Sequence, residues 1–581
     1  MATLIRHTSD PSYLISSLRR GPLHLSHIYH HKLSITRLDR ASRHSSTMAR
    51  TYESALSHLA ALQSNRAVTS LFSPPADASV PKRDLNALAI PEMLAWLRRA
   101  GLSQDELAAN LRCIHVAGTK GKGSVCAYLT ALLTRGDEGT RRVAGKVGTY
   151  TSPHLVSVRE RIAIDGAPIS RALFARYFYE VWDACTEAAR AELASRPTGE
   201  GAEISEEIQG PSTKPFYFRF LTIVALRAFL GEGVRSAVIE CGIGGEYDST
   251  NVLPATCVTA SVVTQLGIDH VGMLGRTLPE IAWHKAGVCK PGRKCFTRRL
   301  EGTGTAEKTA QVLRQRAQEK GATLVEVADK DVEKWGGVKA SEKGAAGSLE
   351  GEFQKYNQAL AVGAAREHLH VLASEYPSER MLGADVTAPE KLEYVPSSFT
   401  SALQYARLRG RCETREDEHA PITWLIDGAH TAESLTEVAR WFCNKTSQAA
   451  HKGNPILLFN QQDRDAAELV SGLLEDLKAN APGPTGAPSF AHAIFSRNDL
   501  RPRESGEPER DLSVQNAAAE ALRANNGITS TSIRDNVADA VAEARTLATR
   551  DSDGDRTTVL VTGSLHLVGA VLRTLEPDAE D

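Results

Sequence analysis

The sequence predicts an α/β protein that contains a mainly parallel sheet and a second, smaller α/β domain. Three observations support this prediction. From residue 51 onward, amphipathic helical segments alternate with short apolar strand-like segments, which is typical of parallel α/β architecture. A glycine-rich turn at 118–124 joins one such strand to the following helix. After a loop-like stretch at 375–398, the alternation begins again and continues toward the C-terminus.

The first domain begins with helices and then places its strands around the glycine-rich turn. The expected helices cover 52–63, 90–99 and 124–133, and the expected strands cover 113–117, 237–241 and 258–264. Two further stretches, 187–212 and 301–348, are mostly polar and poor in large apolar residues. We expect both stretches to be surface insertions or mobile loops.

The second domain follows the stretch at 375–398, which contains Pro377, Pro389 and Pro396. Its expected strands cover 423–426, 456–459 and 559–561, and its expected helices cover 432–443, 466–477, 514–525 and 538–547. A local loop is expected at 482–488. The predicted domains are therefore 48–407 and 408–581, with 1–47 apart from both.

Residues 1–47 differ in composition from the rest of the chain. They are rich in serine and carry two acidic residues, Asp10 and Asp39, against seven basic ones: Arg6, Arg19, Arg20, Lys32, Arg37, Arg40 and Arg43. This composition predicts a mitochondrial transit peptide, and a disordered basic tail is the alternative. Met48 lies just before the first expected helix, so a second start there would give a cytosolic form. We therefore expect mitochondrial and cytoplasmic products that start at Met1 and Met48.

Composition argues against several classes of protein. The 581 residues have a formal net charge of −2, so no global field favours nucleic acid or an anionic membrane. No run reaches the roughly 18 apolar residues that a membrane span needs, and Arg227 interrupts the longest candidate. The nine cysteines include no CxxC pair and fit no zinc pattern, which favours reduced thiols, with Cys113, Cys241 and Cys257 buried in strands. Nothing in the sequence indicates an oligomer interface, so a monomer is expected.

The strongest motif is the turn Gly118-Thr119-Lys120-Gly121-Lys122-Gly123-Ser124. The turn follows a strand and precedes a helix, which is the context that a phosphate-binding loop needs. Its glycines let backbone N–H groups point at phosphate oxygens. The helix N-terminus adds partial positive charge, Lys122 can reach the β- and γ-phosphates, and Ser124 can face Mg²⁺. The template GxxxxGK[ST] is not met literally, since Gly123 separates the lysine from the serine. A surface turn without function is the alternative interpretation.

Further motifs follow this loop in a fixed order. They are TSPHL at 151–155 with RERI at 159–162, FYFRFLT at 216–222, ECGIGGEYD at 240–248 with TN at 250–251, and GIDH at 267–270 with WHKAGV at 283–288. The second part of the chain adds Gly-Arg at 410–411, DGAHT at 427–431, DRD at 463–465 and GSLHLVG at 563–569. The tight phosphate loop resembles that of the Mur ligase superfamily, and the whole series resembles the folylpolyglutamate synthases. The resemblance covers roughly residue 50 to the C-terminus, apart from the insertions.

Two residues in this series attract attention by their chemistry. Glu240 ends a buried strand, where an uncompensated carboxylate is costly, so a metal or a cationic partner is expected. His270 taken alone would be an ordinary core or surface histidine, but its place in the series favours a ligand. The series also departs from the family in two places. Leu408-Arg409 precede Gly410 where the family often has Trp-Pro, and Asn460-Gln461-Gln462 replace a glycine-containing turn.

The resemblance implies a Mur-ligase-like P-loop ATPase domain and a smaller Rossmann-like C-terminal domain, with ATP between them. It implies that residues 118–124 hold the triphosphate and that Arg411 and Asp427 reach the nucleotide from the smaller domain. By the same resemblance Ser152, Glu240 and His270 would bind Mg²⁺, with the histidine serving a second ion. The residues implied at the reaction centre are Lys122, Lys285 and His430. Asp427 is expected to anchor the nucleotide rather than to act as a base.

The activity that the resemblance implies is ATP-dependent addition of L-glutamate to the γ-carboxyl of tetrahydrofolate and its polyglutamates. A free carboxylate is a poor electrophile, so transfer of the γ-phosphoryl group would first make an acyl phosphate, which the glutamate amine then attacks. Related ligases carry a carbamoylated lysine at the position of Lys285, and an unmodified lysine that pairs with phosphate is the alternative. A monovalent cation is a further candidate cofactor.

Other functions remain open from the sequence alone. The nearest is dihydrofolate synthase, or an enzyme that performs both reactions. From a different class comes a P-loop nucleotide sensor without ligase activity. A GTPase would need an NKxD motif, and Asn444-Lys445 lacks the aspartate. Glutamate-dependent ATP hydrolysis distinguishes a ligase from a sensor.

Overall fold

The computed structural model describes residues 50–62, 85–195, 208–340, 347–377, 392–448, 455–462, 464–481, 490–524, 530–550 and 556–577. The predicted transit segment 1–47, the expected loop at 482–488 and Asp463 lie outside the described residues. The proposal of two start sites therefore stays a prediction. The boundary between residues 407 and 408 also stays a prediction.

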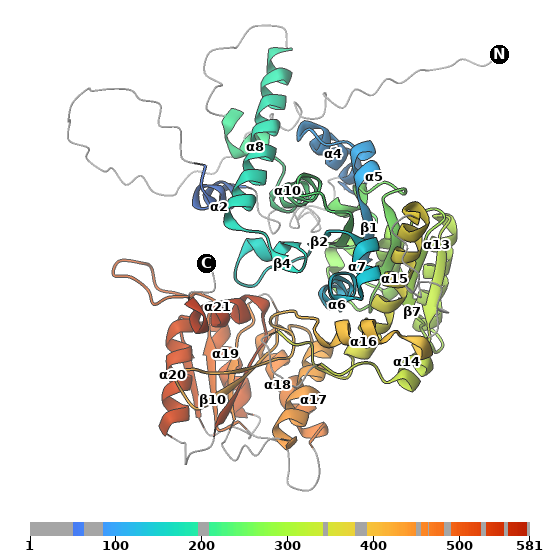
Figure 1. The fold of residues 1–581 in the computed structure, drawn as a ribbon. Helices are drawn as coiled ribbons and strands as arrows, with labels where there is room; N and C mark the ends of the chain where they lie inside the picture. Colours follow the sequence, from blue (N-terminus) through green and yellow to red (C-terminus); the bar gives the residue numbers. More distant parts are fainter. Residues whose placement is uncertain are drawn as a thin grey trace, which may run out of the picture. The chain divides into compact units, whose positions relative to one another are not determined.

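The first sheet has eight strands in the order β4-β3-β2-β5-β1-β6-β7-β8 (Figure 1). Neighbouring strands from β2 to β8 pair in parallel, and β3 and β4 add an antiparallel edge. The strands are β1 (Arg112–Ala117), β2 (Val147–Tyr150), β3 (Ile162–Ile164), β4 (Ala167–Pro168), β5 (Ser236–Glu240), β6 (Val258–Val263), β7 (Lys294–Arg298) and β8 (Thr323–Val327). The mainly parallel sheet predicted from the alternating pattern is confirmed.

Helices cover both faces of this sheet, because successive strand residues point to opposite sides. In β1, Cys113 joins one hydrophobic core, while Ile114 and Val116 join the other. The first core packs against α2 (Tyr52–Ala61), α4 (Leu85–Arg99), α8 (Arg171–Ala194) and α10 (Tyr217–Gly231). The second packs against α6 (Lys122–Arg135), α7 (Glu138–Ala144), α15 (Gln354–Glu375) and α16 (Ser397–Gln404).

Further helices and 3₁₀ turns complete the part of the chain around the first sheet. The α-helices are α5 (Gln104–Asn110), α11 (Val271–Leu274), α12 (Leu278–Lys285), α13 (Thr305–Glu319) and α14 (Asp329–Trp335). The 3₁₀ turns are η2 (Val158–Arg161), η3 (Pro211–Thr213), η4 (Ser249–Val252), η5 (Ala286–Val288) and η7 (Leu392–Tyr394).

Two expectations about loops are wrong. The stretch 301–348 contains α13, β8 and α14, and the stretch 187–212 begins inside α8, which continues to Ala194. In α13, five buried residues form a narrow stripe, and most of the remaining positions are charged or polar. β8 is an edge strand whose residues are half-buried or exposed. These elements bury little apolar surface, so their sequences contain few large hydrophobic residues and were interpreted as loops.

The second sheet has six strands in the order β13-β12-β11-β14-β10-β9. β9 is antiparallel to β10, and the other neighbouring strands pair in parallel. The strands are β9 (Glu413–Glu416), β10 (Ile422–Ile426), β11 (Ile456–Phe459), β12 (His492–Ser496), β13 (Ser530–Arg534) and β14 (Thr557–Thr562). This confirms a second, mainly parallel sheet in the C-terminal part of the chain, with β9, β12 and β13 added to the three expected strands.

The helices of the second sheet also divide between its faces. One core joins α17 (Ala432–Gln448), α18 (Ala466–Ala479) and α19 (Ser513–Ala524), and the other joins α20 (Val537–Arg550) and α21 (Leu565–Leu575). The strand order reverses beside β14, which returns between β11 and β10. In parallel sheets, ligands bind beyond the carboxyl ends of the strands near such a reversal.

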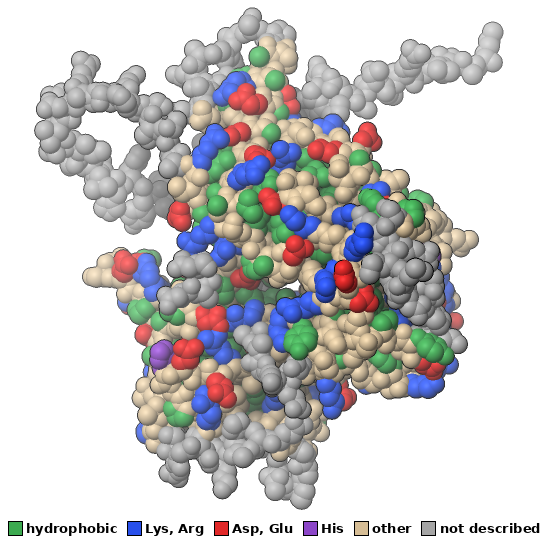
Figure 2. Space-filling view, viewed as in Figure 1, with side chains coloured by type: hydrophobic (Ala, Val, Ile, Leu, Met, Phe, Trp, Pro, Cys, Tyr) green, Lys and Arg blue, Asp and Glu red, His purple; other side chains and the backbone are tan. Residues whose placement is uncertain are grey.

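Surface and core agree with the composition. All nine cysteines are buried free thiols, which confirms the expectation for Cys113, Cys241 and Cys257. On the face shown in Figure 2, basic and acidic side chains are interspersed. None of the helices in the described ranges is both long and apolar enough to cross a membrane.

Candidate active site

The glycine-rich turn lies between β1 and α6, as its motif predicts. Gly118 has φ +148°, and a Cβ there would lie 1.7 Å from Thr264 Oγ1. Gly121 caps α6 in the left-handed conformation with φ +86°, and a Cβ there would lie 2.4 Å from Asn357 Oδ1. The hydroxyl of Thr264 donates to Lys120 O at 2.6 Å and so holds the turn from the adjacent strand β6. The result is a fixed turn at a helix N-terminus, which is a ready anion site.

Two lysine side chains converge on this turn. Lys122 Nζ and Lys285 Nζ both donate to the carbonyl oxygen of Gly118, at 3.1 Å and 2.8 Å. Lys285 ends α12 and is 3% exposed. Burial, followed by repulsion from Lys122, lowers the pKa of Lys285 to about 7. The amine of Lys285, which reaches the phosphate turn from α12, is therefore partly neutral at neutral pH.

Glu240 meets the phosphate turn because β5 pairs in parallel with β1, which brings their carboxyl ends to one edge. The side chain is 3% exposed, and its Oε2 accepts the backbone N–H of Ser152 at 2.9 Å. Burial raises the pKa of Glu240, and the charge of Lys122 is the largest effect that opposes the rise. The structure thus joins two of the three predicted metal ligands directly.

His270 follows β6 on a separate segment. It adopts φ +49°, and its Nε2 lies 3.9 Å from Asp269 Oδ2. The side chain is 47% exposed, and the structure gives it no hydrogen bond to Ser152 or Glu240. Partial burial lowers the pKa of His270, which favours the neutral imidazole that metals bind. His270 as a ligand stays a prediction.

The donor atoms that the side chains of Glu240 and Ser152 offer are oxygens, which Mg²⁺ prefers. Within the described ranges, no three His, Cys, Asp or Glu side chains gather where they could hold a metal. Mg²⁺ does not need such a cage, because it usually takes one or two carboxylates and completes its octahedron with water and substrate phosphates. A buried carboxylate beside a phosphate turn, with a serine on the adjoining segment, is that kind of site. Glu240 and Ser152 therefore fit a magnesium–nucleotide complex.

Asp427 follows β10 in the second sheet and is buried. Its Oδ2 accepts Cys412 N at 2.7 Å and its Oδ1 accepts Ala429 N at 2.8 Å. Burial raises the pKa of Asp427, and the charge of Arg411 opposes the rise most strongly. Both carboxylate oxygens hold backbone N–H groups, so Asp427 fixes the turn that carries Arg411. A direct contact of either residue with the nucleotide stays a prediction.

His430 lies three residues beyond Asp427. Its ring Nδ1 is 3.1 Å from Gly428 O, and its backbone N–H donates to Ser434 Oγ at 3.2 Å. Burial lowers the pKa of His430. The ring is therefore oriented by its own turn and is neutral, and its predicted place at the reaction centre stays a prediction.

Ion pairs join segments of the first sheet to those of the second, and two of these pairs lie at the candidate site. Lys120 Nζ in the phosphate turn lies 3.0 Å from Glu433 Oε2 at the start of α17. Arg464 Nη2, just before α18, lies 2.9 Å from Asp269 Oδ1. The phosphate turn and the His270 segment are both held against the second sheet by charge.

The chain resembles curated proteins along almost its whole length. It is 36% identical over 568 residues to the folylpolyglutamate synthase of Neurospora crassa, which covers 96% of each chain. The chain belongs to the folylpolyglutamate synthase family. The folylpolyglutamate synthase of Saccharomyces cerevisiae strain FostersO is 36% identical over 537 residues, which cover 90% of this chain and 87% of the yeast protein. A scan against family models found no match.

Solved structures of folylpolyglutamate synthases share the fold. A Mycobacterium tuberculosis folylpolyglutamate synthase, studied with ADP and AMPPCP, matches 84% of this chain and 95% of its own, with a TM-score of 0.57 and 24% identity. Escherichia coli FolC in complex with DHPP and ADP matches 91% and 99%, with a TM-score of 0.53 and 21% identity. These likenesses confirm the predicted fold class.

Arg161 is a candidate that the sequence placed only inside a motif. It is 7% exposed, and its Nε donates to His154 Nδ1 at 2.8 Å. Burial, followed by the charge of Arg161, lowers the pKa of His154 to about 3, so this partner is a neutral imidazole. A buried guanidinium whose partner is neutral keeps its charge for an anionic ligand. The available signal was the charged run RER directly before an apolar strand.

An amide pair at the start of α15 was missed altogether. Gln354 Nε2 is fully buried and has no acceptor among the described residues. Gln354 Oε1 accepts Asn357 Nδ2 at 2.9 Å, and Asn357 contacts the phosphate turn at Gly121. Asn and Gln amides match the hydrogen-bonding edge of adenine. The sequence gives little signal for this pair, because the preceding stretch, 301–348, is mostly polar and predicts an insertion.

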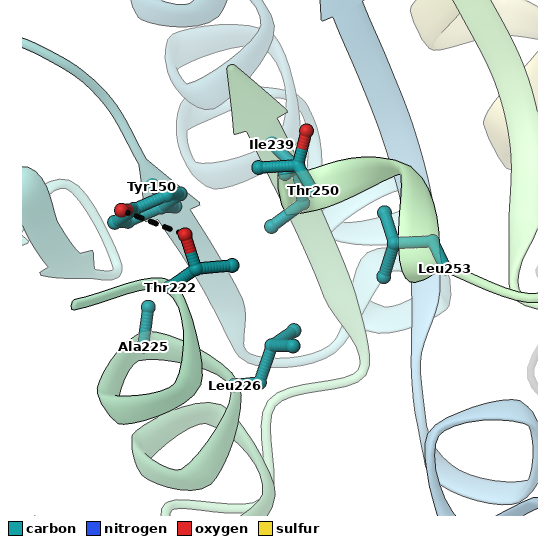
Figure 3. Close-up of a pocket in the computed structure, with 7 residues that line it drawn as sticks. All are labelled: Tyr150, Thr222, Ala225, Leu226, Ile239, Thr250 and Leu253. Atoms are coloured by element: carbon teal, nitrogen blue, oxygen red, sulfur yellow. Dashed lines mark hydrogen bonds between the residues drawn. The ribbon is translucent and has the colours of Figure 1, made fainter. Parts of the chain in front are cut away.

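One small cavity lies between α10 and the strands β2 and β5 (Figure 3). Tyr150 and Thr222 face each other across it, with their hydroxyls 3.1 Å apart. Its space is about 200 Å³, below the roughly 300 Å³ at which small-molecule pockets begin. Its lining is almost entirely apolar carbon from Ala225, Leu226, Ile239 and Leu253. We therefore do not assign the folate to this cavity.

The pKa of Lys285 predicts a pH-dependent stability. The folded pKa is about 7 and the unfolded one is 10.5, so the unfolded chain binds more protons between these values. The free energy of unfolding therefore rises with pH across this window, and the cost of the buried charge is greatest below it. We expect the free energy of unfolding of Lys285→Met to exceed that of wild type near about pH 6 by on the order of a few kcal/mol, so the variant melts at a higher temperature.

The advantage of Lys285→Met should shrink as the pH approaches about 10, as followed by thermal unfolding without nucleotide. Lys146→Met is the matched control, because Lys146 is exposed and its substitution should show no such trend. A difference between Lys285→Met and wild type that stays constant over this range would contradict the lowered pKa.

Proposed function

We propose that this chain catalyses the ATP-dependent addition of L-glutamate to the γ-carboxyl of tetrahydrofolate and its polyglutamates. ATP is split to ADP, and the bond formed is an amide. Membership in the folylpolyglutamate synthase family supports the reaction. A structural relative studied with ADP and AMPPCP supports the nucleotide, and another studied with DHPP and ADP supports a folate-type substrate.

One observation of the structure carries the proposal: a phosphate turn and a buried carboxylate share one sheet edge. The turn offers backbone N–H groups, the α6 N-terminus and Lys122, while Glu240 stands on the neighbouring strand. Phosphate binding alone needs only the turn, and a buried carboxylate is costly to maintain unless a cation compensates it. Phosphoryl transfer uses both, because a metal ion held by the carboxylate would neutralise charge on the phosphates.

Phosphoryl transfer to a carboxylate brings several negative oxygens together, and the site offers cations to balance them. Lys122 would hold the β- and γ-phosphates, as a lysine does in other phosphate loops. Arg161, backed by the neutral His154, is our candidate for the carboxylate that receives the phosphoryl group. Arginine suits this role because its planar fork binds carboxylate oxygens in pairs.

Bound Mg²⁺ would supply charge neutralisation at the phosphate oxygens. Glu240 and Ser152 are our proposed holders of the ion, and His270 is proposed for a second ion, with a monovalent cation as a further candidate. Gln354 and Asn357 are proposed to face the adenine base. Arg411 and Asp427 are proposed to contact the nucleotide from the second sheet.

The later step needs the amine of glutamate in its neutral form, attacking the acyl phosphate. His430 is our proposed side chain nearest this step, since its ring is neutral and oriented. We also propose that the protein acts as a monomer, in mitochondrial and cytoplasmic forms that start at Met1 and Met48. The basic, serine-rich composition of 1–47 supports the mitochondrial form.

Carbamoylation of Lys285 is part of the proposal. The reaction requires a neutral amine, which attacks carbon dioxide and loses a proton, and the lowered pKa supplies that amine near neutral pH. The carbamate would turn a cation beside the phosphate turn into an anion that can face a metal. An unmodified Lys285, as in its present hydrogen bond to Gly118 O, is the alternative.

The activity is tested with protein from Met48 onward, ATP, Mg²⁺, glutamate and either tetrahydrofolate monoglutamate or dihydropteroate. We expect glutamate-dependent ADP release and products that grow by whole glutamyl units on tetrahydrofolate, read by mass spectrometry. Turnover only with dihydropteroate would move the assignment to dihydrofolate synthase. ATP binding without glutamate-dependent turnover on either substrate would favour the sensor.

Glu240→Gln tests the role of the buried carboxylate. The substitution keeps the shape and the acceptor for Ser152 N but removes the charge. We expect turnover to fall at least about 100-fold, with no recovery at high Mg²⁺. Binding of ADP without metal should change less than about threefold, because the phosphate turn is intact. Glu232→Gln, at the end of α10, is the matched control and should keep wild-type turnover. Near-normal turnover of Glu240→Gln would refute the assignment.

Carbamoylation is tested with isotope-labelled bicarbonate. We expect one carbamate carbon signal in the NMR spectrum of wild type, absent from Lys285→Met, and a crystal density for a lengthened Lys285 side chain. Turnover of wild type should rise with bicarbonate. A bare amine in both intact mass and density at high bicarbonate would rule the modification out.

A further inference from the structure

Helix α21 of the second sheet touches the backbone of the segment that carries Ser152. At Gly569, a Cβ would lie 2.3 Å from Leu155 O and 3.1 Å from Leu155 C. Real Cβ atoms do not approach other atoms so closely. The neighbour is backbone rather than the end of a flexible side chain, so it cannot move aside without moving the segment. Glycine is required here for close approach, and not for an unusual φ.

Arg573, one turn further along α21, makes a second contact with the same segment. Its Nε donates to Val156 O at 3.1 Å, and its Nη2 donates to the same oxygen. The side chains of Leu155 and Val156 pack on the core formed by α20 and α21. Two consecutive carbonyl groups of the segment therefore face α21.

The segment is internally rigid, so a contact at one end fixes the other. The Glu160 carboxylate accepts the N–H groups of Leu155, Val156 and Ser157, at 2.8, 2.9 and 2.6 Å. Three residues before Leu155, Ser152 N donates to Glu240. The segment therefore lies between Glu240 on one side and α21 on the other.

We propose that Gly569 and Arg573 are positioning residues, which set the place of Ser152 and His154 beside Glu240 through the backbone of Leu155 and Val156. The inference rests on the proposed function, because it assigns the Ser152 segment to the active site. Gly569 and Arg573 touch no reacting group. Their effect comes from the sensitivity of catalysis to small displacements, where about 1 Å can cost roughly 100-fold.

Gly569→Ala tests the close approach, and Gly472→Ala is its matched control. Gly472 also lies in a helix of the second sheet, but a Cβ there meets nothing within 4 Å. We expect kcat of Gly569→Ala to fall about 10- to 100-fold, with the dissociation constant for ADP within about threefold of wild type. Gly472→Ala should keep wild-type kcat. A kcat of folded Gly569→Ala within about twofold of wild type would overturn the proposal.

Arg573 provides an independent variant that introduces no clash. Arg573→Met removes the donors and keeps most of the stem, whereas Arg573→Lys keeps a charged donor. We expect kcat to fall roughly tenfold in the methionine variant and to be largely restored in the lysine variant, again with little change in ADP affinity. Loss of kcat and of ADP affinity in equal measure would indicate general damage and would contradict positioning.

Hydrogen exchange of the whole chain separates this inference from the proposed function. Peptides covering residues 152–157 should exchange faster in Gly569→Ala than in Gly472→Ala, whether or not the enzyme turns over. Unchanged exchange would overturn the positioning role even in an active enzyme. Wild-type protein without ligase activity would instead refute the proposed function, while faster exchange would still support the contact.

Discussion

The site is organised around a carbonyl oxygen that accepts two lysine side chains. Lys122 and Lys285 come from different helices, yet both donate to Gly118 O. Two cations so close together repel each other, and one of them is buried, so the arrangement is unfavourable unless negative charge is near. A triphosphate supplies that charge. Burial is the main cause of the lowered pKa of Lys285, and repulsion from Lys122 adds to it, whereas the same charge of Lys122 opposes the rise in the pKa of the buried Glu240.

Several central strands were predictable because burial on both faces leaves a continuous apolar run. β1, β5, β6, β10, β11 and β14 were all expected, and each is buried along nearly its whole length. The interior strands β2, β7 and β12 were not expected, because their runs are short or include polar residues. The edges were not predictable on the same basis. β4 is two exposed residues and β8 has no fully buried residue, so neither edge strand leaves a continuous buried apolar run. The helix α13 was not predicted either, because its buried stripe is narrow.

The candidate site shows a similar division. The phosphate turn was predictable since glycines, a lysine and a strand–turn–helix context are all local in sequence. Arg161 and Gln354 were not, because their significance depends on the partner they have or lack in space. The partner of Arg161 is a histidine that has become neutral, and Gln354 has a buried donor that finds no acceptor in the part of the chain that the structure describes. Neither property can be read from spacing along the chain.

The two sheets are connected at several points, and three of these connections meet segments of the candidate site. Lys120 pairs with Glu433, Asp269 pairs with Arg464, and Val156 accepts from Arg573. Exposed ion pairs contribute little to stability, so the first two contacts are weak reasons for the sheets to associate. The contact with α21 differs in kind, because it requires a glycine and uses backbone atoms on the first sheet's side. A side chain at residue 569 would displace the Ser152 segment, because the atoms that it meets are backbone atoms of Leu155. The last helix of the second sheet therefore limits where the Ser152 segment can lie.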